Sequence, residues 1–225
     1  LDEAAVKAAA EKLMAEKVDA IAVCLINSYA NPAHELRVAE ILKEVGFQGG
    51  VSLSHKISGE YREYERTSTT CIDAFVRGRM ANYLRRLDQK LRELGFKGTS
   101  LITRSGSGSM TFAEAEDRPF ETIMSGPVGG AQGASELAKM LDIKALVTAD
   151  VGGTSFDTAL VIDGKPQVLF EGMIDNMPIQ SPWVDVRSIG SGGGSIAHID
   201  AGGLMRVGPR SAGAVPGPAC YGKGG

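Results

Sequence analysis

The sequence predicts an α/β protein, on three observations. Helical patterns alternate with short apolar runs over residues 1–54, a long helical pattern follows, and the last part of the chain consists of short apolar segments separated by glycines. Alternating helices and strands are typical of a sheet with helices packed on it. With 43% hydrophobic and 23% charged residues, the composition is that of a globular protein and excludes a disordered chain.

The spacing of apolar residues predicts the first helices and strands. Residues 2–15 carry alanine, valine, leucine and methionine at helical intervals. Residues 20–25 are an unbroken apolar run, which predicts a strand of a parallel sheet, buried on both faces. Asn31-Pro32 indicates the start of a second helix that ends at Gly46, and residues 51–54 form a second short strand.

A single long helix is predicted over residues 61–94. The segment has no proline and one internal glycine, and its apolar residues recur every three or four positions. Its second half is basic, which we interpret as a solvated face, with a partner-binding stripe as the alternative. A strand near residues 100–103 and a polar loop over residues 105–109 follow.

Charge and rare residue types exclude several classes of function. The formal net charge of −3 argues against a nucleic-acid partner held by a basic face. No apolar stretch reaches the roughly 18 residues of a membrane span, and the first residues lack a signal-peptide pattern. The three cysteines form no CxxC pair, so we expect reduced thiols in a cytoplasmic protein. The three histidines are equally scattered, and no local histidine metal site is expected.

The clearest functional signal is a glycine turn between two apolar strands within residues 145–162. Glycines let backbone N–H groups approach a polyphosphate, hydroxyls add donors, and a carboxylate at a strand end can hold Mg²⁺ through water. These are the parts that phosphoryl transfer requires. An ordinary glycine turn with surface carboxylates is the alternative. The residues concerned are Asp150, Gly152, Gly153, Thr154, Ser155 and Asp157.

Two other phosphate-binding patterns are absent. The sequence contains no GxxxxGK[ST] and no GxGxxG that opens a helix after a strand. Neither a P-loop nor a Rossmann dinucleotide site is therefore supported.

Residues 150–157, Asp-Val-Gly-Gly-Thr-Ser-Phe-Asp, resemble the second phosphate motif of the superfamily of actin, sugar kinases and heat-shock chaperone ATPases. Residues 125–134 are similar to the small-residue helix that precedes that motif and packs at its interdomain hinge. A closer resemblance is to the hydantoinase A and 5-oxoprolinase family. It covers essentially the whole chain, through Ser28–Glu35, Arg62–Thr70, Ser125–Gly130, Asp150–Ser155, Ser188–Ser195, Asp200–Gly203, Val207–Pro209 and Ser211–Gly222.

This resemblance implies an actin-like (ribonuclease H-like) ATPase fold and an ATP-dependent activity. Members phosphorylate the carbonyl of a hydantoin, 5-oxoproline or related lactam, and a B-type subunit or domain completes ring opening. By carry-over, Gly152, Gly153 and Thr154 would cradle nucleotide phosphates, with Ser155 beside them. Asp150 would hold Mg²⁺ through water or position the attacking oxygen, and Asp157 is a weaker candidate for the same site.

A second glycine-rich segment, residues 189–195, lacks side chains that would block the approach of its backbone to phosphate. We expect it to line the nucleotide or substrate cleft, with a flexible structural turn as the alternative; its candidates are Gly190, Gly192, Gly193 and Gly194. Asp185 and Arg187 flank the segment and could form an ion pair. For Asp200, Arg206 and Arg210 we favour a structural salt bridge, and for Cys220 a structural role.

The sequence also departs from the family pattern. Residues 104–109, Arg-Ser-Gly-Ser-Gly-Ser, stand where many relatives carry Ser-Asn-Gly-Gly or Ser-Asp-Gly-Gly, which puts the substrate class in doubt. The chain starts without methionine inside a helical pattern, so we expect an excerpt that lacks the first phosphate motif and the adenine site. We assign residues 1–58 to the end of a first lobe, residues 59–143 to a connecting α/β segment and residues 144–225 to the start of a second lobe.

Three alternatives to a cyclic amide hydrolase stay open. One is a subunit of an ATP-dependent ketone carboxylase that acts on acetone or acetophenone and requires bicarbonate. Another is a chaperone-like or filament-forming ATPase, in which hydrolysis drives a conformational change. The last is a scaffold domain that binds no nucleotide. An oligomer is expected, and the fragment alone is expected to be inactive.

Overall fold

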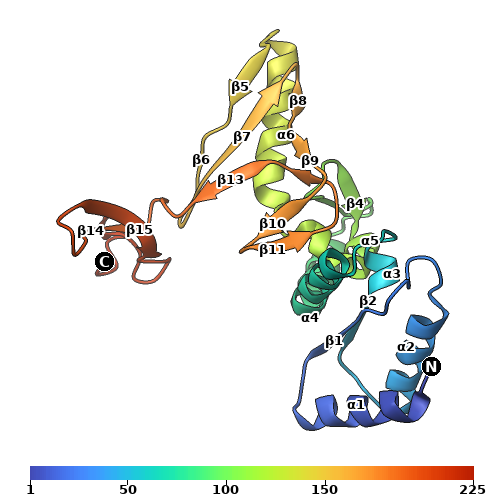
Figure 1. Ribbon diagram of the computed structural model, residues 1–225. Coiled ribbons are helices and arrows are strands. Elements are labelled where there is room, and N and C mark those ends of the chain that lie inside the picture. Colours follow the sequence, from blue (N-terminus) through green and yellow to red (C-terminus); the bar gives the residue numbers. More distant parts are fainter. The chain divides into compact units, whose positions relative to one another are not determined.

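A computed structural model describes all residues, 1–225 (Figure 1). The chain forms two compact units. Unit 1 contains Leu1–Ser125 and Leu169–Trp183, and unit 2 contains Gly126–Val168 and Val184–Gly225. Unit 1 is thus made from two separate stretches of sequence.

The first part of unit 1 is a helix–strand–helix–strand arrangement: α1 (Glu3–Ala15), β1 (Ala20–Val23), α2 (Ala33–Glu44) and β2 (Gly50–Leu53). β1 and β2 pair in parallel, with Ala20 opposite Gly50 and Val23 opposite Leu53. The side chain of Asp2 caps α1 by accepting a 3.0 Å hydrogen bond from the amide of Ala5. A hydrophobic core joins these elements through Ala10, Ile21, Val23, Val38, Leu42 and Leu53.

A buried carboxylate holds the carboxyl end of β1 and the start of α3 (Ser54–Ile57) to α2. Glu35 is fully buried and accepts hydrogen bonds from the amides of Leu25 (2.9 Å) and His55 (3.0 Å), the hydroxyl of Ser54 (2.6 Å) and Nδ1 of His55 (2.7 Å). Burial raises the pKa of Glu35, but these hydrogen bonds outweigh it and hold the pKa below its usual value.

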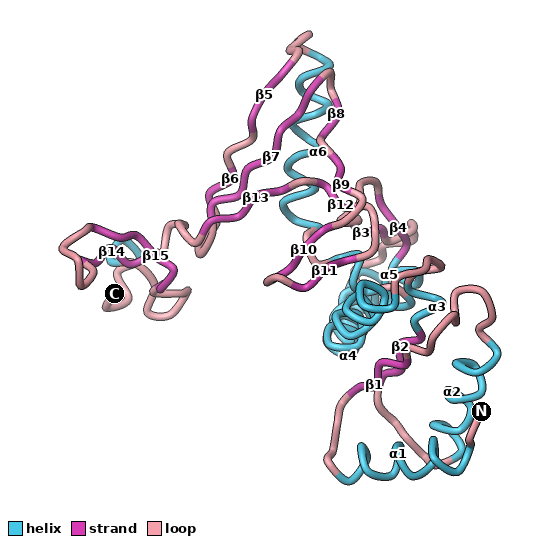
Figure 2. The backbone as a smooth tube through the Cα atoms, viewed as in Figure 1, coloured by secondary structure: helices cyan, strands magenta, loops and turns pink.

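The long helix α4 (Glu63–Glu93) is the central element of unit 1 (Figure 2). It packs on β1, β2, α3, α5 (Phe112–Asp117), η1 (Pro119–Thr122) and β11 (Met177–Ile179). Acidic residues in its first turn and basic residues in its last turn oppose the helix dipole. A second core beside it contains Ile57, Ile72, Phe120, Ile179 and Trp183.

Two hairpins and two short helices complete unit 1: β3 (Leu101–Thr103), β4 (Ser109–Thr111), α5 (Phe112–Asp117), η1 (Pro119–Thr122), β10 (Gly172–Ile174) and β11 (Met177–Ile179). A capping box between Thr111 and Glu114 starts α5. Gln180 joins β11 to the rest of unit 1. Its amide nitrogen lies 2.9 Å from Oγ1 of Thr69, and its side chain bonds the hydroxyl of Ser58 (2.9 Å) and the carbonyl oxygen of Tyr61 (2.6 Å).

Unit 2 begins with α6 (Ser125–Met140) and an antiparallel five-stranded sheet. Its strands are β5 (Ala145–Val147), β6 (Asp150–Val151), β7 (Phe156–Ile162), β8 (Lys165–Pro166) and β13 (Val186–Ile189). β7 is the central strand and pairs with all four others. Two short strands, β9 (Val168–Leu169) and β12 (Trp183–Val184), pair with each other where the chain passes between the units.

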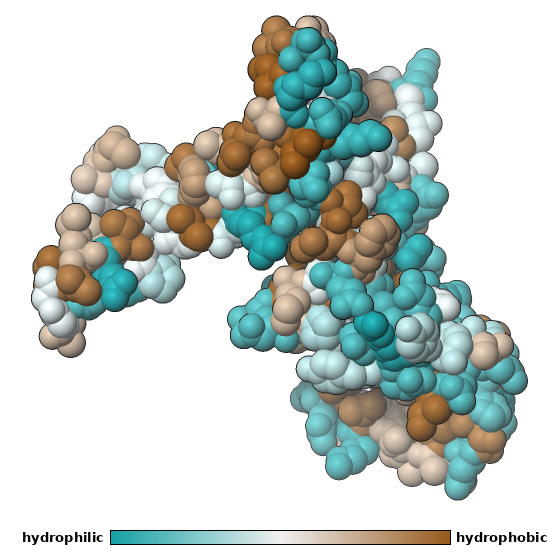
Figure 3. Space-filling model, turned by 45° about the horizontal axis from the view of Figure 1, so that its top comes forward, coloured by the Kyte–Doolittle hydropathy of each residue, from teal (hydrophilic) through white to brown (hydrophobic).

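The last elements of unit 2 are β14 (Ser195–Ile199), β15 (Met205–Ser211) and η2 (Ala219–Tyr221). β14 and β15 form an antiparallel ladder with an irregularity between Ser195 and Ala197. In the main sheet, Ala159 and Val161 of β7 are buried, whereas Val147, Leu160 and Ile162 are exposed. Figure 3 shows that hydrophobic residues, in brown, form part of the surface of the molecule.

The structure confirms the elements that strong periodicity predicted. The helices expected over residues 2–15, from Asn31-Pro32 to Gly46, and over residues 61–94 are α1, α2 and α4. The apolar run at residues 20–25 contains β1, which pairs in parallel with β2 as expected. The expected burial on both faces is not found, because Ile21 and Val23 are buried whereas Ala20 and Ala22 are half-buried. In the expected loop over residues 105–109, Ser109 already belongs to β4. The assignment of residue ranges to two lobes stays a prediction.

Candidate functional site

The glycine turn lies at the tip of the hairpin formed by β6 and β7. Asp150 lies opposite Asp157 and Val151 opposite Phe156 in the antiparallel ladder. The turn closes with a 2.9 Å hydrogen bond from the amide of Gly152 to the carbonyl oxygen of Ser155. The sequence folds this way because apolar, strand-forming residues on both sides meet at two glycines.

Three consecutive backbone amides in this turn have no acceptor within the chain. The N–H groups of Gly153, Thr154 and Ser155 donate no intramolecular hydrogen bond, and neither does the hydroxyl of Thr154. Gly153 and Thr154 are exposed, and no atom outside the turn lies near the position that a Cβ of Gly153 would take. Unpaired donors on successive residues can together bind an anion.

The two aspartates of the hairpin differ in environment. Asp157 is buried, and its carboxylate accepts hydrogen bonds from the hydroxyls of Ser155 (3.0 Å) and Ser188. Asp150 is exposed, and its carboxylate has no hydrogen-bond or ion-pair partner. Asp157 therefore holds the turn in place through Ser155 and Ser188. The carboxylate of Asp150 is free to contact a ligand.

A groove of about 400 Å³ lies beside Asp150 in unit 2. Pro127, Gly130 and Ala131 of α6 form one wall, and the segment around Thr148 and Asp150 forms the other. A Cβ on Gly130 would lie 3.8 Å from Oδ2 of Asp150, so small residues let α6 come close to this carboxylate. The small-residue helix seen in the sequence thus forms part of the same site.

The second glycine-rich segment contacts the turn directly. The amide of Gly193 donates to the carbonyl oxygen of Gly152 (2.9 Å), and that of Gly194 donates to the carbonyl oxygen of Gly153 (2.7 Å). The amide of Gly192 donates to the hydroxyl of Ser195 at 2.8 Å. These three amides are occupied within the chain, so the segment supports the turn. Gly190, at the end of β13, packs against Pro209.

Gly192 fits only because it has no side chain. A Cβ there would lie 2.6 Å from the amide nitrogens of both Thr154 and Ser155 and 2.7 Å from the carbonyl oxygen of Gly152. Close approach of two backbones is a recurrent reason for glycine. The structure thus brings together residues from two sequence motifs that lie almost 40 positions apart.

Ser188 is a contributor that the sequence analysis did not single out. It lies in β13 opposite Asp157, and its hydroxyl donates to the Asp157 carboxylate. Its position in the sequence could have indicated a role, since Ser188 is the first residue of the motif that contains the second glycine-rich segment. Its pairing with β7 depends on a non-local strand contact, which the sequence alone did not reveal.

Two ion pairs expected from the sequence are present in unit 2. Asp185 pairs with Arg187 at 2.6 Å and Asp200 pairs with Arg206 at 2.8 Å, as the sequence suggested. No group of three or more histidine, cysteine, aspartate or glutamate side chains is placed to hold a metal ion. The exposed Asp150 suits Mg²⁺ held through water and phosphate oxygens, the mode usual for this ion. Cys220 is a free, exposed thiol.

Comparison with protein families matches the chain along most of its length. Residues 66–225 match the hydantoinase/oxoprolinase family, and residues 1–46 match the hydantoinase/oxoprolinase N-terminal region. The chain belongs to the hydantoinase/oxoprolinase family. The resemblance noted in the sequence is thereby confirmed.

Curated relatives of this family member carry several names. The chain is 37% identical to the caprolactamase subunit alpha of Pseudomonas jessenii, covering 100% of the chain and 32% of that protein. It is 41% identical to the acetophenone carboxylase gamma subunit of Aromatoleum aromaticum, covering 100% of the chain and 31% of that protein. It is 34% identical to the 5-oxoprolinase of Saccharomyces cerevisiae, covering 100% of the chain and 17% of that protein. The chain thus spans about a third or less of the length of these relatives.

Two solved structures share the fold of this family member. A nucleotide-free acetone carboxylase structure matches with a TM-score of 0.85 at 30% identity, covering 95% of the chain and 30% of that chain. The ATP-dependent caprolactamase from Pseudomonas jessenii matches with a TM-score of 0.76 at 37% identity. The match covers 100% of this chain and 33% of the caprolactamase chain. The mixed α/β architecture agrees with the expected fragment of an actin-like ATPase fold. None of its helices has the length and apolar character needed to span a bilayer.

Proposed function

We propose that this chain supplies a phosphate-binding turn to an ATP-dependent enzyme that opens a cyclic amide. The observation that carries the proposal is the row of three unpaired amides at Gly153, Thr154 and Ser155, next to the unpaired carboxylate of Asp150. Donors fixed before a ligand arrives stabilise phosphate charge without a cost of reorganisation. In this proposal, the turn belongs to the start of a second lobe over residues 144–225.

Each residue has a defined task in the proposed site. The amides of Gly153, Thr154 and Ser155 and the hydroxyl of Thr154 donate to phosphate oxygens of ATP. Asp150 holds a water ligand of Mg²⁺ or orients the attacking carbonyl oxygen. When bound, Mg²⁺ neutralises charge on the phosphate oxygens. The turn is held in its conformation by Asp157, Ser188 and the glycine-rich segment of residues 190–194.

The substrate is proposed to be a hydantoin, 5-oxoproline or related lactam, with a B-type subunit completing the hydrolysis. Relatives named caprolactamase and 5-oxoprolinase support a cyclic amide, and relatives named as alpha, beta or gamma subunits support a partner chain. A ketone carboxylase subunit is the second candidate. It is favoured by the identity of 41% with an acetophenone carboxylase subunit and by the TM-score of 0.85 with acetone carboxylase.

Release of ADP from the full-length protein tests both candidates. The protein, combined with its B-type subunit, is incubated with Mg²⁺ and ATP, with and without hydantoin, 5-oxoproline or caprolactam. Stimulation by a cyclic amide in the absence of bicarbonate supports the first proposal. Stimulation that requires both a ketone and bicarbonate would replace it with the second. ATP hydrolysis unaffected by either kind of substrate would contradict both.

A further inference from the structure

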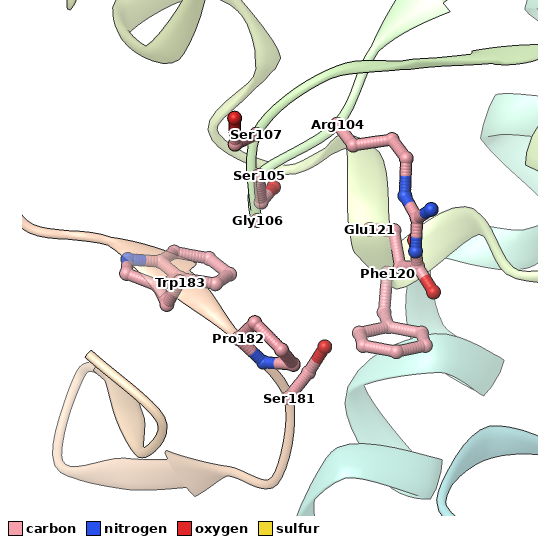
Figure 4. Close-up of a pocket in the computed structure, with 9 residues that line it drawn as sticks. All are labelled: Arg104, Ser105, Gly106, Ser107, Phe120, Glu121, Ser181, Pro182 and Trp183. Carbon is pink, nitrogen blue, oxygen red and sulfur yellow. The ribbon is translucent and has the colours of Figure 1, made fainter. Parts of the chain in front are cut away.

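A small cavity in unit 1 lies apart from the turn in sequence and has its own polar and aromatic walls. It has a volume of about 210 Å³ and lies between the loop that joins β3 to β4, η1, and residues 181–183 (Figure 4). Ligand pockets for drug-sized molecules span about 300–1,000 Å³. This cavity therefore suits a smaller ligand, of the size of a single substituted ring.

The walls of the cavity are held in place by backbone contacts. The amide of Ser105 donates to the carbonyl oxygen of Glu121 (2.7 Å), and the hydroxyl of Ser105 accepts from the amide of Met124 (3.1 Å). A Cβ on Gly106 would lie 2.6 Å from the carbonyl oxygen of Pro182, so the loop and the segment that carries Trp183 are in direct backbone contact. The cavity is thus part of the folded unit.

Aromatic rings and an ion pair give the cavity its chemistry. Phe120 and Trp183 are 1% and 5% exposed, and both rings border it (Figure 4). Flat ring faces favour a flat ligand. Arg104 forms an ion pair with Glu121, whose side chain is only 5% exposed.

The polar groups of this ion pair are incompletely satisfied. Nε of Arg104 and Oε1 of Glu121 are buried without hydrogen bonds. Oε1 forms a second ion pair with Nε of Arg118 at 3.0 Å, and that nitrogen also lacks a hydrogen bond. The hydroxyl of Ser181, which also borders the cavity, has no hydrogen-bond partner. Unsatisfied buried polar groups are rare and are ordinarily completed by water or a ligand.

We propose that this cavity binds the amide edge of a small cyclic amide, an inference that rests on the proposed function and assigns its substrate recognition to named residues. A ring amide presents a carbonyl oxygen and an N–H side by side. Arg104 and Ser181 donate to the carbonyl oxygen, Glu121 accepts from the N–H, and the ring lies against Trp183. A cyclic ketone has the carbonyl oxygen but no N–H, so it leaves Glu121 without its partner.

Direct binding to the full-length protein without nucleotide tests the proposal. The matched ligands are 2-pyrrolidinone and cyclopentanone, which differ in one ring position, N–H against CH₂. Calorimetry or ligand-detected NMR is expected to show binding of 2-pyrrolidinone that is about tenfold tighter than that of cyclopentanone. Equal affinities would overturn the assignment of an amide edge, and no binding of either would overturn the site.

Two variants locate the binding. Arg104→Met and Ser181→Ala change side chains that are not part of a hydrophobic core, and each is expected to weaken 2-pyrrolidinone binding by about three- to tenfold. Arg85→Met is the control, since Arg85 forms an exposed ion pair with Glu116 elsewhere in unit 1. Unchanged binding in Arg104→Met and Ser181→Ala would overturn the location. ATP affinity, measured on the same samples, reports separately on the turn.

Discussion

The backbone amide of Gly194 donates a 2.7 Å hydrogen bond to the carbonyl oxygen of Gly153. This bond and its neighbour from Gly193 to Gly152 take up the carbonyl oxygens of the turn and leave its later amides without acceptors. Three successive amides of the turn therefore stay free to donate, which is the polarity that an anionic ligand requires.

Gly153→Ala is predicted to weaken nucleotide binding without destabilising the protein. A Cβ at this position meets no atom within 4 Å, so the folded chain accommodates it. The methyl group would nevertheless stand where phosphate has to approach the backbone. We expect a loss of affinity of about tenfold or more, equivalent to about 1.4 kcal/mol, measured by calorimetry with ATP. Gly133→Ala, which also has open space, is the control and should bind normally.

Asp150→Asn is predicted to abolish Mg²⁺-dependent ADP release while leaving the free energy of unfolding nearly unchanged. Asp150 is exposed and has no intramolecular partner to lose, and amides are weaker ligands for hard cations than carboxylates. Asp142→Asn, at an exposed position in the same unit, is the control. Normal turnover in Asp150→Asn would remove Asp150 from the site.

Gly192→Ala is predicted to destabilise the protein by about 1 to 3 kcal/mol, because its Cβ would overlap the backbone of the turn. Chemical denaturation measures the effect. Gly193→Ala provides a close comparison, since its Cβ would make only an ordinary 3.7 Å contact with the carbonyl oxygen of Gly152. Equal stability of the two variants would show that the turn can move to make room.

Glu35→Gln is predicted to reduce the sensitivity of the protein to acid. The folded pKa of Glu35 lies below its usual value of 4.5, so its stabilising effect is present above that pH and is lost as the pH falls through the folded pKa. The wild type should therefore lose more thermal stability on acidification than Glu35→Gln, which is less stable at neutral pH. Glu40→Gln, on the exposed face of α2, is the control and should lose as much thermal stability on acidification as the wild type.

The sequence predicted the elements whose pattern is local. The apolar run that contains β1 and the long periodic segment of α4 need no distant partner to be recognised, and the hairpin around Gly152 and Gly153 carries its own turn signal. The strands from β8 to β15 were largely missed. Those from β8 to β12 have only two or three residues, which give no measurable period, and β14 and β15 lie in glycine-rich sequence. β13 also depends on pairing with β7, a strand far along the chain, and β12 on pairing with β9.

For the candidate site, the sequence identified the residues of the turn and of the second glycine motif. It did not separate their tasks. The division between the free amides of Gly153 to Ser155 and the occupied amides of Gly192 to Gly194 depends on contact between two backbones. The role of Ser188 depends on strand register. Neither the contact between the two backbones nor the strand register can be recognised from a short stretch of sequence.

Unit 1 is completed by residues 169–183, which are made after the first half of unit 2. Gln180 supplies partners for Ser58, Tyr61 and Thr69, and Trp183 joins the core around Phe120. A chain that ends at Ser125 therefore lacks part of the core of unit 1. Because the glycine turn of residues 152–155 precedes residues 169–183, unit 1 reaches its final packing only after that turn has been synthesised, and a truncation before residue 150 removes both.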